Sequence, residues 1–153
     1  MHLEIIDGET RIDDVKTLFA EYAASLGIDL AYQNFGDEFA GLPGKYAYPN
    51  GRLYLALVDG APAGSVAMRG LDEARAEMKR LYVRSDFRGA KVGLALTERI
   101  IADAREIGYR ALVLDTLSTM QRAQALYRSL GFVEIEPYYD SPIPGTTYLS
   151  LSL

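Results

Sequence analysis

The stretch from residue 81 to residue 96, LYVRSDFRGAKVGLAL, constrains the fold most, because it joins an apolar strand to a helix through a basic turn. Gly89 and Gly93 let the backbone approach a ligand closely. The free N–H groups of the first helical turn point outwards, at the positive end of the helix dipole. Such a turn predicts an anion site, most often one for phosphate.

The basic residues and the glycine spacing of this turn narrow the choice of ligand. Arg88 and Lys91 add positive charge, so a diphosphate would meet backbone donors and cations together. A nucleotide P-loop ends in Gly-Lys-Ser/Thr, whereas Leu94 follows Gly93, and the Gly-x-Gly of a dinucleotide fingerprint is missing after Gly89. The pattern that remains is Arg-Gly-x-x-x-Gly.

Length, composition and charge predict one soluble domain over residues 1–153. The chain has 49% hydrophobic and 24% charged residues, which is ordinary for a globular fold. A net charge of −5 argues against nucleic acid and anionic membrane surfaces as partners. The first residues contain no basic segment followed by a long apolar run, so we expect no signal peptide, no membrane span and a cytoplasmic location.

The residue inventory excludes several kinds of catalysis. Without cysteine, the chain cannot form disulfides, thiolate metal sites or a cysteine nucleophile. The single histidine, His2, lies beside the N-terminus, so a Ser/His catalytic pair is not expected. We therefore expect chemistry without a metal and without a covalent enzyme intermediate.

Hydrophobic periodicity predicts alternating strands and helices in the first half of the chain. Thr10 starts a segment that resembles a capping box, and Gly27 follows the helix expected after it. Asp59-Gly60 is a strong hairpin signal between two strand-like runs. The expected elements are a strand over 3–6, helices over 12–26 and 34–40, and antiparallel strands over 52–58, 63–69 and 74–83.

The second half continues the alternation. Residues 111–115 form a short continuous apolar run, as expected of a strand buried on both faces and parallel to its neighbour. Ser118 opens a cap for the helix that Gly131 ends. The expected elements are a helix over 91–107, the strand over 111–115, a helix up to residue 130, a strand over 132–136 and a final strand through Leu149, Leu151 and Leu153. Periodicity alone indicates only an α/β or α+β fold.

Three segments resemble the GNAT superfamily of acyl-CoA-dependent N-acyltransferases in their order and spacing. They are EMKRLYV at 77–83, RGAKVG at 88–93 and AQALYRSLGF at 123–132, and the detailed resemblance covers about residues 74–136. The resemblance implies the mixed-sheet GNAT fold, β-α-α-β-β-β-α-β-α-β-β. In that fold the strands that hold Leu81 and Leu114 splay apart, and the pantetheine arm of the cofactor lies in the gap.

The same resemblance implies acetyl-CoA as co-substrate and assigns residues to it. Backbone N–H groups of the turn would hold the pyrophosphate, the strand before it would pair with the pantetheine, and the Leu81 N–H would polarise the thioester carbonyl. The implied cofactor-binding residues are Leu81, Tyr82, Val83, Arg88, Gly89, Ala90, Lys91, Val92, Gly93 and Ser118. The chain departs from the family at Met120, where many members have asparagine, so Ser118, Thr119 or backbone would replace that contact.

Two catalytic roles follow from the resemblance. Tyr127 takes the position of the general acid, and a phenol with a pKa of about 10 can protonate a thiolate whose thiol has a pKa of about 8.5. The alternative is a tyrosine that only packs in the core. Glu77 lies four residues before Leu81, on the same face if the strand alternates, and is the candidate base. Its alternative is a solvated carboxylate paired with Lys79 or Arg80.

The acceptor is expected to be a primary amine of a small molecule or peptide. Asp37, Tyr46 and Tyr138 are the candidate substrate-binding residues, and they would suit a small cationic amine through charge and cation–π contacts. The prediction is direct transfer of acetyl to that amine, in a monomer or a homodimer. The alternatives are a CoA-binding sensor without turnover and a nucleotide-binding enzyme that uses the same turn.

Overall fold

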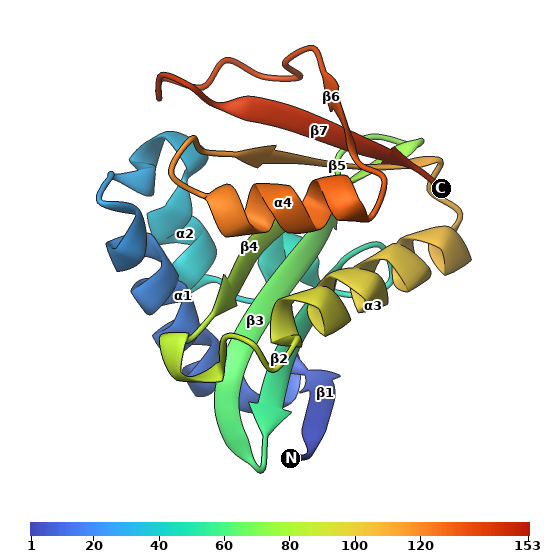
Figure 1. Ribbon diagram of the computed structural model, residues 1–153. Helices are drawn as coiled ribbons and strands as arrows, with labels where there is room; N and C mark the ends of the chain where they lie inside the picture. Colours follow the sequence, from blue (N-terminus) through green and yellow to red (C-terminus); the bar gives the residue numbers. More distant parts are fainter.

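Seven strands form one mixed sheet in the order β1-β2-β3-β4-β5-β7-β6, in a computed structural model that describes all of residues 1–153 (Figure 1). The strands are β1 (Leu3–Asp7), β2 (Arg52–Val58), β3 (Ala61–Gly70), β4 (Arg75–Val83), β5 (Ala111–Thr116), β6 (Val133–Ile135) and β7 (Thr147–Ser152). The helices are α1 (Ile12–Leu26), α2 (Phe35–Ala40), α3 (Val92–Ile107) and α4 (Gln121–Ser129). The predicted element order and the single mixed α/β fold are confirmed.

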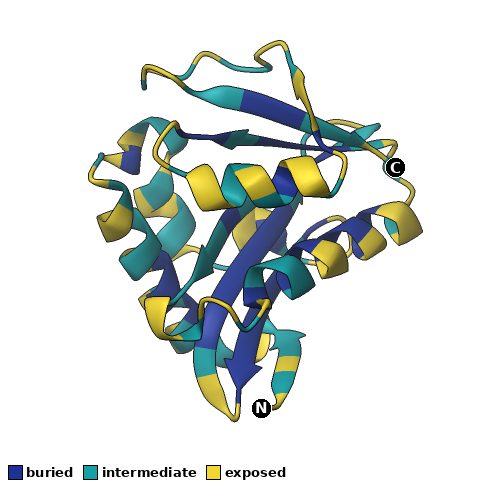
Figure 2. Ribbon diagram, in the orientation of Figure 1, coloured by how far each residue is buried: buried dark blue, intermediate teal, exposed yellow.

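Helices cover both faces of the sheet and divide the core into two clusters. Leu18 and Phe19 of α1 pack with Leu55 of β2 on one face. Leu96 and Ile100 of α3 belong to the larger cluster on the other face. Figure 2 shows the central strands buried between these helices, whose outer faces are exposed. No helix combines the length and the apolar character needed to cross a membrane.

The two halves of the sheet meet along a short parallel ladder between β4 and β5. Only Arg75–Glu77 of β4 pair with Ala111–Val113 of β5. Beyond these residues the strands separate, β4 continuing along β3 and β5 along β7. The splay that the sequence resemblance implied is therefore present, and it opens a gap at the centre of the sheet.

A β-bulge at Arg80 overturns the alternation expected along β4. Arg80 has a φ of 61°, and the pairing with β3 shifts between Ala67↔Lys79 and Ser65↔Tyr82. One extra residue on a strand reverses which face the following side chains occupy. Leu81 thus packs in the α3-side core cluster and not on the Glu77 face, so the predicted shared face of Glu77 and Leu81 is wrong.

Two predicted helix caps do not form. Before α1 the chain makes a 3₁₀ turn over Gly8–Arg11, and the Thr10 hydroxyl donates to the Asp7 carbonyl instead of capping the helix. Before α4 a tight turn runs from Leu117 to Met120, closed by the Met120 N–H. Met120 occupies the N-cap position of α4, so Ser118, two residues earlier, cannot cap the helix.

Candidate active site

A cavity of about 550 Å³ opens where β4 and β5 separate. Its walls come from β4, β5, the turn before α3, α4 with the turn before it, and α1 with the segment after it. The cavity therefore joins the anion turn to the splayed strands.

The turn before α3 presents free backbone donors at one end of the cavity. Gly89 and Lys91 adopt left-handed conformations, with φ of 92° and 59°, and α3 begins at Val92. The N–H groups of Arg88 and Ala90 donate to carbonyls inside the turn, at 3.3 and 3.2 Å. The remaining N–H groups in the turn, those of Gly89, Lys91, Val92 and Gly93, have no backbone acceptor. These four N–H groups can therefore bind an anion.

Most of the predicted cofactor-binding residues meet at this cavity. Those that line it are Leu81, Tyr82, Val83, Arg88, Gly89, Lys91, Val92 and Gly93. Ala90 and Ser118 do not line it, and Ser118 instead lies near Gly145 in the loop before β7. Thr119 and Met120 do reach the cavity. Of the substitutes considered for the missing asparagine, Thr119 is thus the better placed side chain.

Tyr127 projects from α4 into the cavity with its ring against Phe132, the centroids 5.6 Å apart. It is only 6% exposed, and its hydroxyl makes no hydrogen bond to another protein group. Burial raises the pKa of Tyr127 well above its usual value, and the nearby Tyr22 and Asp115 raise it further. Because Tyr127 lines the cavity, its hydroxyl is available to a ligand there.

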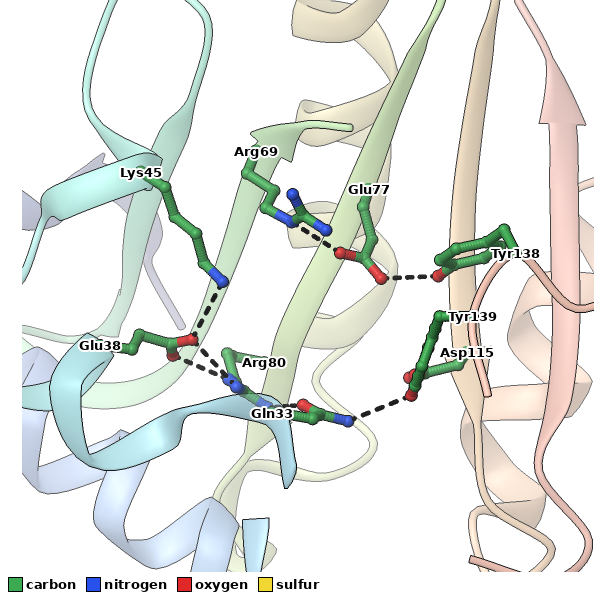
Figure 3. Close-up of polar contacts among 9 residues, drawn as sticks. All are labelled: Gln33, Glu38, Lys45, Arg69, Glu77, Arg80, Asp115, Tyr138 and Tyr139. Carbon is green, nitrogen blue, oxygen red and sulfur yellow. Dashed lines mark hydrogen bonds and ion pairs between the residues drawn. The ribbon is translucent and has the colours of Figure 1, made fainter. Parts of the chain in front are cut away.

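Glu77 precedes the cavity-lining residue Met78 on β4 but does not itself line the cavity, and two partners hold it. It is 3% exposed, accepts a hydrogen bond from Arg69 Nε at 2.9 Å and another from the Tyr138 hydroxyl at 2.6 Å (Figure 3). The expected alternative, a solvated carboxylate paired with Lys79 or Arg80, is wrong, because Glu77 is buried and pairs with Arg69. Tyr138, predicted to bind substrate, is brought to Glu77 by the loop between β6 and β7.

Arg80 is the centre of a buried polar network on the α1 and α2 face. Its Nε and NH2 groups donate to the two Glu38 oxygens at 2.8 and 3.0 Å, and NH1 donates to Gln33 Oε1 at 2.6 Å. Lys45 Nζ lies 3.7 Å from the same Glu38. Burial opposes the charge of Glu38, but the hydrogen bonds and charge of Arg80 prevail and hold its pKa below the usual value.

Asp115 faces the cavity from β5, and Tyr139 donates a hydrogen bond to it. Gln33 connects the two networks, because its amide Nε2 reaches the Tyr139 hydroxyl at 3.5 Å (Figure 3). Burial raises the pKa of Asp115; the Tyr139 hydrogen bond opposes this effect, while the charge of Glu77 adds to it. Sequence reasoning missed Asp115, although an acid at the end of an apolar strand was a visible signal.

None of the three predicted acceptor residues, Asp37, Tyr46 and Tyr138, lines the cavity. Asp37 is exposed on α2 and makes no ion pair, whereas its neighbour Glu38 is buried against Arg80. Tyr46 is 1% exposed, with a buried hydroxyl that has no hydrogen-bond partner. The structure therefore brings together Glu77 and Tyr138 but places Asp37 and Tyr46 elsewhere.

Comparison with known proteins is consistent with this geometry. The profile of the acetyltransferase (GNAT) family matches residues 15–132. An uncharacterized N-acetyltransferase of Dictyostelium discoideum is 35% identical, with 100% of both chains covered. Another, of Schizosaccharomyces pombe, is 42% identical over 93% of this chain and 88% of its own. N-acetylaspartate synthetase of Danio rerio is 33% identical over 84% of this chain, which spans 47% of that relative.

Solved structures share the fold. An acetyltransferase from Streptococcus agalactiae has a TM-score of 0.81 at 24% identity, covering 99% of this chain and 98% of its own. A GNAT family acetyltransferase from Elizabethkingia anophelis with acetyl-CoA bound has a TM-score of 0.58 at 24% identity, covering 68% and 77%. At these identities the likeness concerns the arrangement of helices and strands.

Proposed function

The chain belongs to the GNAT family of N-acetyltransferases, and from that premise we propose that it transfers acetyl from acetyl-CoA to a primary amine by direct attack. The observation that carries the proposal is the continuous cavity from the free N–H groups of the turn to the splayed edge of β4. A diphosphate fits the first end, and an extended chain that hydrogen-bonds like an added strand fits the second. The relative from Elizabethkingia anophelis, which has acetyl-CoA bound, supports this choice of donor.

The cofactor contacts in this proposal come from backbone more than from side chains. The N–H groups of Gly89, Lys91, Val92 and Gly93 would hold the pyrophosphate, with Arg88 and Lys91 adding charge. Leu81 and Val83 would pair with the pantetheine, and the Leu81 N–H would donate to the thioester carbonyl. That donor is most useful in the transition state, where negative charge gathers on the oxygen.

The transfer itself needs proton movements at both the amine and the sulfur. A carboxylate on the acceptor side, Glu77 or Asp115, takes a proton from the acceptor ammonium and frees the nitrogen lone pair. The nitrogen then forms a bond to the carbonyl carbon, the C–S bond breaks, and the departing sulfur takes a proton from Tyr127. The nitrogen loses its second proton as the amide forms, and that proton restores the Tyr127 hydroxyl, while the carboxylate releases the first proton to solvent. The products are the amide and free CoA. Because the chain has no cysteine, no acetyl-cysteine intermediate can form.

The experiment that tests the proposal measures thiol release from acetyl-CoA across a panel of amines. Amino acids belong in that panel beside simple amines, since one relative is named N-acetylaspartate synthetase. We expect saturable thiol release that depends on at least one amine and yields its acetylated product. Glu77→Gln and Asp115→Asn, compared on the best acceptor, would identify the carboxylate that takes the proton.

A CoA-binding sensor is the second candidate, favoured by one observation. Met120 reaches the cavity in place of the expected amide side chain. Saturable binding of CoA without thiol release on any amine would favour the sensor and contradict acetyl transfer.

A further inference from the structure

We propose that the acceptor is an amino acid with free amino and carboxylate groups, its ammonium held by Asp115 on β5 and its carboxylate by Lys79 on β4. This inference rests on the proposed acetyl transfer and names the class of substrate for the same cavity.

The first support is the position of the two side chains on either side of the gap. The last rung of the β4–β5 ladder joins Glu77 to Val113. Side chains two residues further on share the same face, so Lys79 and Asp115 occupy the first positions after the strands part. Both residues line the cavity. Opposite charges therefore stand on the two walls of the cavity where it begins.

The second support is that neither charged group forms an ion pair within the protein. Lys79 makes no ion pair and no hydrogen bond through its side chain, and Asp115 accepts only the Tyr139 hydroxyl. The neighbouring charges differ, because Arg80 is bound to Glu38 and Arg69 to Glu77. Lys79 and Asp115 are therefore the charged groups of this region left to bind a ligand, and their opposite signs match a zwitterion.

The desolvation of both groups agrees with this role. Burial lowers the pKa of Lys79 to about 8, and burial raises the pKa of Asp115. Burial thus weakens the charged form of each group, and the opposite charges nearby, Glu77 beside Lys79 and Lys79 and Arg80 beside Asp115, only partly restore it. A carboxylate beside Lys79 and an ammonium beside Asp115 would stabilise both charged forms at once.

The balance of charged side chains around Lys79 and Asp115 also favours an acceptor that carries a carboxylate. Four cationic side chains stand here against three carboxylates, although the chain as a whole carries −5. The cations are Lys45, Arg69, Lys79 and Arg80, and the carboxylates are Glu38, Glu77 and Asp115. A polyamine would bring a second positive charge to a surplus of cations. An acceptor that carries a carboxylate relieves that surplus.

Asp115 is also held in a fixed position, as a selective contact requires. The rings of Tyr138, Tyr139 and Tyr148 pack against one another in tilted and edge-to-face contacts, with centroids 5.3 to 5.6 Å apart, and Tyr139 donates a hydrogen bond to the Asp115 carboxylate. Gln33 ties Tyr139 to Arg80 across the gap. The ammonium would therefore meet a positioned carboxylate and not a mobile one.

The test compares each standard L-amino acid with its own carboxamide, using kcat/KM for thiol release from acetyl-CoA. The two acceptors have nearly the same size, but the carboxamide has no negative charge. Its ammonium is also the more acidic, so it supplies more free amine at neutral pH. A preference for the acid can therefore come only from binding. We expect the best amino acid to exceed its carboxamide roughly ten- to hundredfold.

Lys79→Met should abolish that preference, because it keeps an unbranched side chain of similar length and removes the charge. We expect kcat/KM for the acid to fall roughly ten- to hundredfold, with the carboxamide changed only a few-fold. Lys16→Met is the matched control, since Lys16 lies on α1 outside the cavity lining and its loss changes the net charge equally. It should leave the acid-to-carboxamide ratio as in the parent. Asp115→Asn should raise KM for acid and carboxamide alike.

Three other outcomes would contradict the amino-acid inference or the proposed acetyl transfer. Equal or better turnover of carboxamides by the parent enzyme would overturn the amino-acid inference, point to peptide amines and leave acetyl transfer standing. A Lys79→Met enzyme that keeps the preference for the acid would also overturn it. Absence of thiol release with every amine would contradict the proposed function, and the inference would fall with it.

Discussion

Tyr127 shows how burial changes what a single residue can do. The raised pKa of the phenol makes it a weaker acid than a free tyrosine, so it would not give up its proton before the thiolate forms. The same burial also disfavours a thiolate, whose negative charge would develop beside the hydroxyl. Proton donation is therefore favoured as the C–S bond breaks, when the sulfur charge is greatest.

Tyr127→Phe isolates this role, because it keeps the ring against Phe132 and removes only the hydroxyl. We expect kcat to fall roughly 10²–10⁴-fold, with acetyl-CoA affinity nearly unchanged. Because the pKa of Tyr127 is raised, the parent should show no loss of kcat from this group as pH rises through 10. Steady-state kinetics and CoA titrations measure both quantities. A kcat within a few-fold of the parent, with chemistry rate-limiting, would mean that water protonates the sulfur.

For single residues, the sequence predicted those cavity residues that can be recognised from the residues beside them in the chain. Gly89 and Gly93 lie at the cavity as their spacing indicated, and Tyr127 reaches it from its helix. Lys79 and Asp115 were not predicted, because their role depends on where two strands part. Which charges remain unpaired follows from contacts between residues far apart in the chain, such as Arg80 with Glu38.

At the scale of elements, β4 shows the limit of reading alternation from sequence. Residues 74–83 predicted a regular strand, and nothing in that run marks Arg80 as a bulge, since a left-handed residue is usually glycine or asparagine. The contacts of Arg80 favour the bulge, because its guanidinium is bonded to Glu38 and Gln33 on the α2 side. Tertiary contacts therefore override the local preference of the strand.

Glu38→Gln should destabilise the fold, because it leaves the Arg80 guanidinium buried without a negative partner. The Arg80 and Glu38 side chains are 1% and 4% exposed. Removing one partner of a buried pair costs about 3–5 kcal/mol, and we expect about 3 kcal/mol because the amide still accepts one hydrogen bond. Urea unfolding at pH 7 measures this loss. Glu21→Gln is the control, since Glu21 and Arg84 are about one-third exposed and should contribute about 0–1 kcal/mol.

The free energy of unfolding should depend on pH differently in the parent and in Glu38→Gln. The folded-state pKa of Glu38 lies below its usual value, so its contribution is complete above about pH 4.3 and is lost as pH falls through the folded-state pKa. The parent should therefore lose stability in acid more steeply than Glu38→Gln. Parallel curves for the two proteins would show that the pair contributes nothing to acid sensitivity.

For the whole molecule, the sequence predicted the order of helices and strands. It did not predict where along β4 and β5 the two halves of the sheet part. Periodicity located most strands and helices, while the mixed sheet and its splay came from the family resemblance. In the structure only the short ladder at Arg75–Glu77 joins β4 to β5, and the cavity lies beyond it. Beyond this ladder the two halves are joined by α3, which packs on both β4 and β5, and by hydrogen bonds of Tyr138 to Glu77 and of Gln33 to Arg80 and Tyr139.

Acetyl-CoA should stabilise the molecule by bridging that gap. A ligand that binds only the folded state at one hundred times its Kd adds about 2.7 kcal/mol to the free energy of unfolding. We expect the added protection from hydrogen exchange to concentrate at Leu81–Val83 and at the turn before α3. Thermal unfolding and hydrogen exchange, with and without acetyl-CoA, measure the two effects.

Gly93→Ala is the variant that makes this prediction specific. A Cβ at residue 93 would meet Val83 and Leu126 at 3.6 and 3.7 Å, which are ordinary contacts, and alanine favours a helix by about 1 kcal/mol over glycine. The free protein should therefore be as stable as the parent or more so. The new methyl group would stand where the pyrophosphate approaches the backbone, so the shift caused by acetyl-CoA should shrink strongly. An undiminished shift in this variant would show that the turn before α3 does not hold the cofactor.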